Sequence, residues 1–193
     1  MKTHKVEQGS EEWFALRSGK LTGSMASRVG NNRTESHILE AVASKLSSGE
    51  RRDFTSIDME RGNELEPQAR ALYELQTDCE VEEVGFVEMN EYIGCSPDGL
   101  VGKDGGIEIK CPKDEVYVKL LIDEKVDSKY MWQIQMCMLV CERKWWDYVA
   151  FNPNFKQSLF ITRVLPDETM QEKLKDGFKV GAEKIKEYLS KIS

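Results

Sequence analysis

The residues with the clearest chemical potential are an aspartate in a tight turn and a glutamate and lysine on the apolar segment that follows it. Asp98 lies in the sequence GCSPDGL (residues 94–100), and Glu108 and Lys110 lie in GIEIKC (residues 106–111). A proline before and a glycine after an aspartate are typical of a turn. Side chains alternate between the two faces of a strand, so Glu108 and Lys110 would share one face. A hairpin between the two segments would therefore bring two carboxylates together.

Neighbouring carboxylates repel each other unless one is protonated or a cation lies between them. Oxygen ligands alone favour Mg²⁺ or Mn²⁺. A lysine beside such an ion could orient a water and neutralise charge that develops on a phosphoryl group, which indicates phosphodiester hydrolysis. The spacing alone leaves a second interpretation open. An exposed charged strand face would also carry Glu-x-Lys in a chain with 34 acidic and 27 basic residues.

Length and composition are those of a single globular domain over residues 1–193. The net charge is −7, and the acidic excess lies after residue 70, where 23 acidic residues outnumber 16 basic ones. An acidic chain can still bind DNA when its acids cluster at a metal site. The N-terminal residues lack a signal-peptide core, and the longest apolar run, Met136–Cys141, is too short to span a membrane. We therefore expect a cytoplasmic protein with no membrane partner.

The cysteines predict reduced thiols rather than disulfides. They are odd in number, irregularly spaced and mostly set in apolar sequence: Cys79, Cys95, Cys111, Cys137 and Cys141.

Hydrophobic periodicity and capping residues predict the elements that must position the turn and strand. Helices are expected over residues 11–18, from Thr22 or Ser24 onward, and over 34–47, 57–77, 128–144 and 167–193, with Pro67 marking a kink or a second helix start. Strands are expected as two hairpins, 81–90 with 92–96 and 99–102 with 106–112, and later over 145–153 and 158–165. This order predicts an α/β fold with a central mixed β-sheet flanked by α-helices on both faces.

The turn and strand resemble the PD-(D/E)xK nuclease signature, which would read here as Pro97-Asp98 followed by Glu108-x-Lys110. Five segments are similar, in order, to the phage lambda exonuclease (YqaJ-type viral recombinase) family: EEWFALRSGKLTGS (11–24), RGNELEPQARALYE (61–74), CSPDGL (95–100), IEIKCP (107–112) and YMWQIQMCM (130–138). The signature alone is weak, whereas five ordered blocks are specific. The resemblance implies a restriction-endonuclease-like core.

The resemblance also implies roles for individual residues. Asp98 and Glu108 would ligate Mg²⁺ (or Mn²⁺) with the main-chain carbonyl of Ile109, Lys110 would orient the attacking water, and Glu66 would support the metal site. Four further residues match positions that hold the 5′-phosphate: Arg17, Ser24, Ser96 and Gln133.

Local sequence also allows simpler interpretations of Glu66 and of three of the four residues assigned to the 5′-phosphate. Arg17 could be a solvated cation at a helix end, Ser24 an N-cap, Gln133 an amide at the edge of the core, and Glu66 an acid favoured by a helix dipole.

The function implied by the resemblance is a Mg²⁺-dependent exonuclease. It would degrade one strand of duplex DNA from the 5′ end, release mononucleotides and leave a 3′ tail. The family resemblance further implies a homotrimeric ring, a phage or prophage origin and a single-strand annealing protein as partner in recombination. Two alternatives remain: a Cas4-like nuclease with an iron–sulfur cluster on four cysteines, and a catalytically silent protein that binds DNA ends.

The tryptophans and one arginine pair are also candidates for contacts to DNA. At least three of the four tryptophans (Trp13, Trp132, Trp145 and Trp146) are expected to pack in the core or between subunits rather than to stack on bases. The pair Arg51-Arg52 is a candidate contact to the DNA backbone, although a solvated loop is the simpler interpretation.

Overall fold

The computed structural model describes residues 1–47 and 57–192. The Arg51-Arg52 pair lies outside the described residues, so its proposed DNA contact remains a prediction. Among the described residues, no helix is both long enough and apolar enough to cross a membrane.

The centre of the fold is a five-stranded mixed sheet in the order β2-β5-β6-β7-β8. Its strands are β2 (Val81–Glu82), β5 (Gly99–Val101), β6 (Gly105–Lys110), β7 (Trp146–Phe151) and β8 (Leu159–Val164). The β6 and β7 strands are parallel, and the other pairs are antiparallel. The parallel pair requires a crossover, which the chain between these strands supplies with two helices. A smaller antiparallel sheet contains β1 (Lys2–His4), β3 (Phe86–Asn90) and β4 (Ile93–Cys95).

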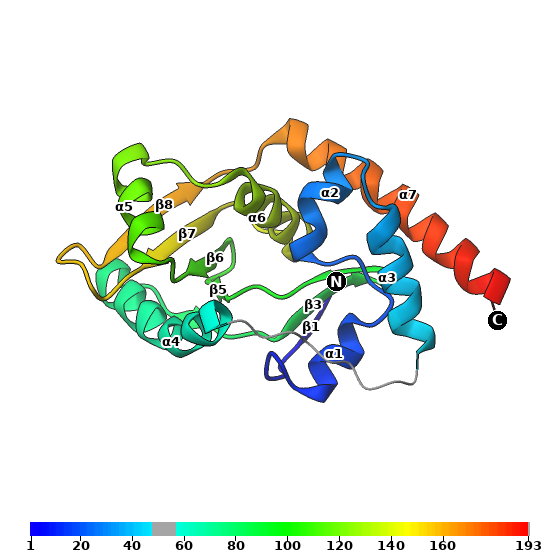
Figure 1. Cartoon of the computed structure of the whole chain (residues 1–193), viewed down its shortest axis with the longest axis horizontal. Helices are drawn as coiled ribbons and strands as arrows, with labels where there is room; N and C mark the ends of the chain where they lie inside the picture. Colours follow the sequence, from blue (N-terminus) through cyan, green and yellow to red (C-terminus); the bar gives the residue numbers. More distant parts are fainter. Residues whose placement is uncertain (48–56, 193) are drawn as a thin grey trace.

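Helices cover both faces of the central sheet, as the sequence predicts (Figure 1). On one face α4 (Ile57–Thr77) packs through Ala69 and Tyr73 against Ile107 and Ile109 of β6. On the other face α6 (Ser128–Cys141) packs with the opposite side chains of β7, including Tyr148. The odd and even positions of each central strand therefore belong to two separate cores, as the period of two requires.

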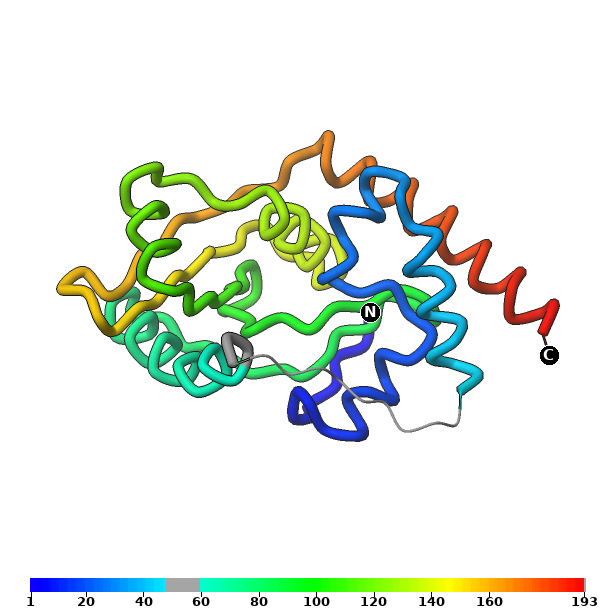
Figure 2. The backbone as a smooth tube through the Cα atoms, viewed as in Figure 1, coloured from blue at the N-terminus to red at the C-terminus, as the bar shows by residue number. Residues whose placement is uncertain are grey.

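Five of the remaining elements lie around the smaller sheet and α6: α1 (Glu11–Arg17), the 3₁₀ turn η1 (Gly23–Met25), α2 (Ala26–Gly30), α3 (Glu35–Leu46) and α7 (Glu168–Ile192). The α5 helix (Asp114–Asp123) instead packs through Tyr117 against the segment between β7 and β8 (Figure 1). The α7 helix packs against α2, α3 and α6 through an apolar stripe that includes Leu174, Phe178 and Ile185. Figure 2 shows its C-terminal end at the rim of the molecule, far from the central strands.

Three details of the sequence prediction are wrong or incomplete. The β1 strand was not predicted, because three residues are too few to show a period. The α5 helix was also missed, since its Val-Tyr-Val sequence favours a strand, yet Tyr117 and Leu120 are buried at helical spacing. Pro67 does not begin a second helix, because α4 continues through it from Ile57 to Thr77.

Candidate active site

Pairing of β5 with β6 brings the three residues of the PD-(D/E)xK signature together. Gly99 pairs with Ile107, so the turn that holds Asp98 lies beside the middle of β6. The Ile109 main-chain N–H donates to Asp98 Oδ2 at 2.6 Å. Lys110 Nζ lies 2.5 Å from Glu108 Oε1 and 3.6 Å from Asp98 Oδ2. We call Asp98, Glu108 and Lys110 the hydrolytic cluster.

Glu108 is fully buried because β6 lies between β5 and β7 in the sheet. Its Oε1 accepts hydrogen bonds from Gln133 Nε2 at 2.7 Å and from Lys110. Its Oε2 is buried and has no hydrogen-bond partner within the described part of the chain. Burial raises the pKa of Glu108 to about 8, and the charge of Asp98 adds to the rise while Lys110 opposes it. A buried carboxylate oxygen without a partner is costly, and a bound cation would remove this cost.

Lys110 remains charged in this environment. Burial lowers its pKa, but the neighbouring charges of Glu108 and Asp98 outweigh burial, so the net pKa is raised. The ammonium also donates to the main-chain carbonyl of Ile109 at 2.8 Å and lies 5.6 Å from the centre of the Tyr130 ring. These contacts fix a permanent cation beside both carboxylates.

Glu66 approaches the cluster from α4 and is linked to it by an arginine. Arg70, one turn later, donates to Glu66 Oε1 at 2.7 Å and to the main-chain carbonyl of Asp98 at 3.3 Å. Burial raises the pKa of Glu66 to about 7, the Asp98 charge raises it further, and Arg70 lowers it. The predicted support role of Glu66 is compatible with this position. Arg70 was not singled out from the sequence, although the i,i+4 spacing of Glu66 and Arg70 on a helix is a recognisable signal.

The available donors fit a hard divalent cation. Asp98, Glu108 and Glu66 supply carboxylate oxygens, and Ile109 supplies a main-chain carbonyl next to Lys110. Over residues 1–47 and 57–192, no group of three His, Cys, Asp or Glu side chains is arranged as a ready metal site, and Lys110 lies between two of the acids. Oxygen donors and the unpartnered Glu108 Oε2 are suited to Mg²⁺ or Mn²⁺ rather than to a soft metal.

A second group of polar side chains lies next to the hydrolytic cluster, and we call it the arginine pocket: Arg17, Thr22, Ser24 and Ser96. Ser10 caps α1 by accepting from the Trp13 N–H, and Arg17 ends the same helix. Arg17 donates to Ser96 Oγ at 3.2 Å and to Thr22 Oγ1 at 3.4 Å. Thr22 Oγ1 in turn lies 3.5 Å from Ser24 Oγ.

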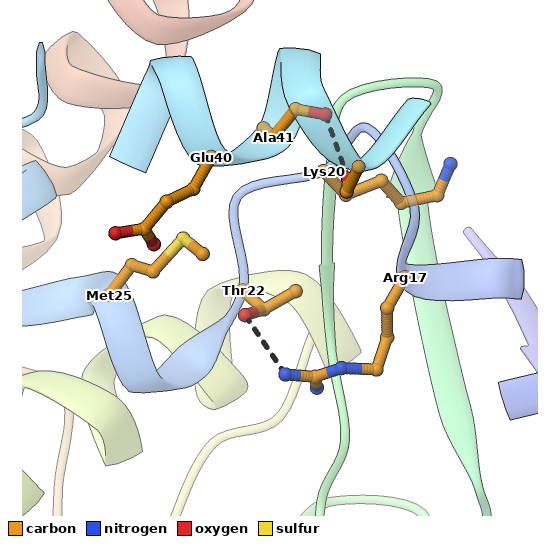
Figure 3. Close-up of a pocket in the computed structure, with 7 residues that line it drawn as sticks. Arg17, Lys20, Thr22, Met25, Glu40 and Ala41 are labelled. Atoms are coloured by element: carbon orange, nitrogen blue, oxygen red, sulfur yellow. Dashed lines mark hydrogen bonds between the residues drawn. The ribbon is translucent and has the colours of Figure 1, made fainter. Parts of the chain in front are cut away.

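Figure 3 shows Arg17 reaching toward Thr22 across a small cavity of about 150 Å³. Lys20, Met25 and residues of α3 line the same cavity. Trp13 supports the pocket from outside it, because its indole N–H donates to Ser96 Oγ at 2.9 Å and its ring lies 4.2 Å from the Arg17 guanidinium. Thr22 and Trp13 were not expected at this position, although the i,i+4 spacing of Trp13 and Arg17 could have indicated their contact.

Gln133 connects the two groups. It donates to Glu108 in the hydrolytic cluster, and its Cγ lies 3.4 Å from the point where a Cβ on Gly23 would be. Gly23 directly precedes Ser24 in η1, and α6 packs against η1, so Gln133 lies beside the segment that carries Ser24. The structure thus places Arg17, Ser24 and Ser96 in one group, whereas Gln133 hydrogen-bonds to Glu108 of the hydrolytic cluster.

The sequence profile of the YqaJ-like viral recombinase domain matches residues 12–144. The chain belongs to this family. The resemblance inferred from the five sequence blocks is therefore confirmed. A comparison with curated proteins finds no match.

Solved structures agree with the family assignment. The alkaline exonuclease LHK-Exo from Laribacter hongkongensis is 30% identical, with a TM-score of 0.85 and coverage of 95% of this chain and 96% of that one. The same exonuclease in complex with dAMP gives a TM-score of 0.86 at 30% identity, with the same coverage. A phage-related exonuclease from Haemophilus somnus is 18% identical, covers 93% of this chain and 99% of its own, and shares the fold with a TM-score of 0.65. The family assignment and the structural similarity support a nuclease that acts on DNA.

The cysteines do not form a set of four. Cys95, Cys137 and Cys141 are buried together, with 3.6 Å between the sulfurs of Cys95 and Cys141, while Cys79 and Cys111 belong to the other core. All five are free thiols, as the sequence predicts. A Cas4-like cluster requires four thiolate ligands, which this arrangement does not supply.

The tryptophans mainly serve packing, as expected. Trp132 and Trp146 are buried in one core, and Trp145 packs at the edge of the other, where Arg163 lies 3.8 Å from its ring centre. Trp13 differs, because it contacts the arginine pocket.

Proposed function

We propose that this protein is a Mg²⁺-dependent exonuclease on double-stranded DNA. It degrades one strand from the 5′ end, releases mononucleotides and leaves a 3′ single-stranded tail. The observation that carries this proposal is the direct connection between the hydrolytic cluster and the arginine pocket. Gln133 of α6 donates to Glu108, α6 packs against the η1 turn that contains Ser24, and Ser96 of the pocket is two residues from Asp98.

The arginine pocket supports the 5′ to 3′ direction. A guanidinium with hydroxyl groups around it suits a phosphate, because Arg can donate two parallel hydrogen bonds to phosphate oxygens. Arg17 already directs both terminal nitrogens toward hydroxyls of the pocket. A terminal 5′-phosphate held there would place the next phosphodiester of the same strand at the adjacent hydrolytic cluster. Cleavage at that position releases one nucleotide at a time.

The hydrolytic cluster supplies the chemistry. Asp98, Glu108 and the Ile109 carbonyl would hold the cation, with Glu66 supporting it from α4. When bound, Mg²⁺ or Mn²⁺ would supply a Lewis acid beside the phosphate. Lys110 holds its ammonium where it can orient the attacking water and stabilise negative charge on the phosphoryl group. Gln133 donates to Glu108 Oε1 and keeps that carboxylate in a fixed orientation.

The family resemblance supports a proposal for the wider role. We propose a homotrimeric ring around the duplex, because a ring would keep DNA from diffusing away between cuts. The protein would act in the cytoplasm with a single-strand annealing protein in recombination of the phage type.

The test is digestion of a linear duplex that carries a different label on each 5′ and 3′ end, with Mg²⁺ and with EDTA. We expect labelled mononucleotides from the 5′ ends first, intact 3′ labels on shortened duplex, and no cleavage in EDTA. A matched sample of Asp98→Asn controls for contaminating nucleases. Release of the 3′ label first would refute the proposed polarity. Tight binding of DNA ends without cleavage would favour the catalytically silent alternative.

A further inference from the structure

Arg70 makes a set of contacts that the proposed mechanism does not use. From the middle of α4 it donates to Glu66 at 2.7 Å and to the Asp98 main-chain carbonyl at 3.3 Å, and it lies 2.7 Å from Glu83 Oε2. Its side chain is only 13% exposed, although it carries a full charge. A charged group is rarely buried to this degree unless it is paired, and here one guanidinium contacts three separate segments.

These contacts hold Glu66 of α4 and the segment of Asp98 at a defined position relative to each other. Glu66 and Asp98 come from different elements, a helix and the bend before β5, and they repel each other when both are ionised. The other contacts between α4 and the central sheet are mainly apolar, through residues such as Ala69 and Tyr73, and apolar contacts do not fix the direction of a carboxylate. A planar guanidinium with several N–H donors can hold one carboxylate and one carbonyl at a defined separation.

We propose that Arg70 is a positioning residue that holds Glu66 and the Asp98 turn in the geometry needed to bind the divalent cation. This inference rests on the proposed function, because it assigns Arg70 to the cation site of the proposed exonuclease. Arg70 acts through Glu66 and Asp98 and does not itself contact the cation or DNA. Glu83 is 70% exposed and contacts the guanidinium from the solvent side.

A purely electrostatic role and a positioning role of Arg70 predict opposite changes in the affinity for a divalent cation. If Arg70 only added positive charge near the site, its removal would strengthen binding of a divalent cation, because a repulsive charge would be lost. If Arg70 positions the ligands, its removal weakens binding, since Glu66 and the Asp98 turn lose their shared anchor. Direct measurement of cation binding therefore separates the two roles without reference to catalysis.

The experiment compares Arg70→Met with Arg70→Lys and with a control, Arg163→Met. Arg163 also pairs with a buried carboxylate of the same sheet, Asp147, through bonds of 2.8 and 2.9 Å. Binding of Mn²⁺ alone is followed by electron paramagnetic resonance of the free ion, and thermal denaturation checks folding. We expect Arg70→Met to weaken Mn²⁺ binding and to lower kcat by about 10- to 100-fold. Losses of this size are typical when a residue that hydrogen-bonds to a metal ligand is replaced.

The two other variants refine this expectation. Arg70→Lys keeps the charge but loses the planar fork, so we expect an intermediate affinity for Mn²⁺. Arg163→Met should lose thermal stability and keep the wild-type affinity. The KM for duplex DNA should change little in Arg70→Met, because Arg70 does not contact the substrate.

A double variant tests whether Arg70 acts through Glu66. In a Glu66→Gln background, Arg70→Met should have a clearly smaller effect on Mn²⁺ affinity than in the wild-type background, because the two changes remove the same interaction. Unchanged or tighter Mn²⁺ binding by Arg70→Met, or strict additivity in the double variant, would overturn the inference. Absence of DNA cleavage by the wild-type protein would instead refute the proposed exonuclease, while the Mn²⁺ measurements would still test Arg70.

Discussion

Replacement of Lys110 by methionine removes the ammonium that contacts both acids of the hydrolytic cluster while keeping a side chain of similar length. Lys110 Nζ lies 2.5 Å from Glu108 Oε1 and 3.6 Å from Asp98 Oδ2. Loss of one preorganised group that stabilises transition-state charge costs about 2.7–4 kcal/mol, or roughly 10²- to 10³-fold in kcat. We expect a decrease of this size in Lys110→Met, with affinity for duplex DNA largely unchanged.

The same variant should lose a moderate amount of stability. Removal of one partner of a buried ion pair costs about 3–5 kcal/mol when the other charge stays buried. Glu108, with its pKa raised to about 8, can take up a proton at neutral pH instead. The expected cost is therefore nearer to that of an unsatisfied polar group, about 1–3 kcal/mol. For a domain of this size the melting temperature should fall by roughly 2–12 °C.

Single-turnover cleavage of a 5′-phosphorylated duplex measures the chemical step, and fluorescence anisotropy in EDTA measures binding. The control is Lys144→Met, which removes an exposed lysine paired with Asp104 at 3.0 Å and should leave both quantities unchanged. Cleavage by Lys110→Met at the wild-type rate would refute the role of Lys110. A loss of cleavage fully explained by weaker DNA binding would refute it as well.

Three further variants and one change of conditions give distinct expectations. Arg17→Ala should lower kcat/KM on 5′-phosphorylated ends by roughly 10- to 100-fold, because it removes one charged hydrogen bond of about 1.5–3 kcal/mol. Its kcat/KM on 5′-hydroxyl ends should not change. A wild-type protein with no preference between the two kinds of end would contradict the phosphate pocket. In EDTA the folded protein keeps a proton on Glu108 up to about pH 8, far above the usual glutamate pKa of about 4.3 for an unfolded chain. Stability in EDTA should therefore decrease as pH rises through this window, and the rise in melting temperature on adding Mg²⁺ should be larger at pH 8.5 than at pH 6; an equal rise at both values would argue against a cation at this carboxylate. Gly30→Ala should destabilise the fold by about 1–3 kcal/mol in urea denaturation, because the new Cβ would lie 2.1 Å from the Trp132 ring. Gly62→Ala, which meets no atom within 4 Å in α4, should instead stabilise by about 0.5–1 kcal/mol.

The central sheet shows which parts of the fold could be predicted from sequence. The alternation in β6 assigned Ile107 and Ile109 to one face and Glu108 and Lys110 to the other, and the two cores follow that division. The predicted hairpin of 99–102 with 106–112 formed as β5 and β6, but the predicted strand over 81–90 is divided into β3, which pairs with β4, and β2, which pairs with β5 in the other sheet. Strand periodicity defines the faces of a strand and contains no information about which sheet it joins.

The candidate site shows the same limit. Local sequence placed Asp98 in a turn near Glu108, because both lie within one hairpin. It gave no means of bringing Arg17 and Gln133 to that hairpin, since they lie far from it in the chain and their local patterns fit ordinary helix positions. The family resemblance supplied those positions. Neither source indicated Arg70, whose contacts depend on how α4 packs against the turn.

The sequence by itself determined the family and the residues that are candidates for its chemistry. Residue types, the period of two in β6 and the ordered family blocks fixed the acids, the lysine and the family. Tertiary structure decided how those groups interact. Burial of Glu108 between β5 and β7 leaves one oxygen without a partner among the described residues, Gln133 reaches Glu108 from α6, and Arg70 joins Glu66 to Asp98. The physical reason is that burial and long-range hydrogen bonds arise only when distant segments pack together.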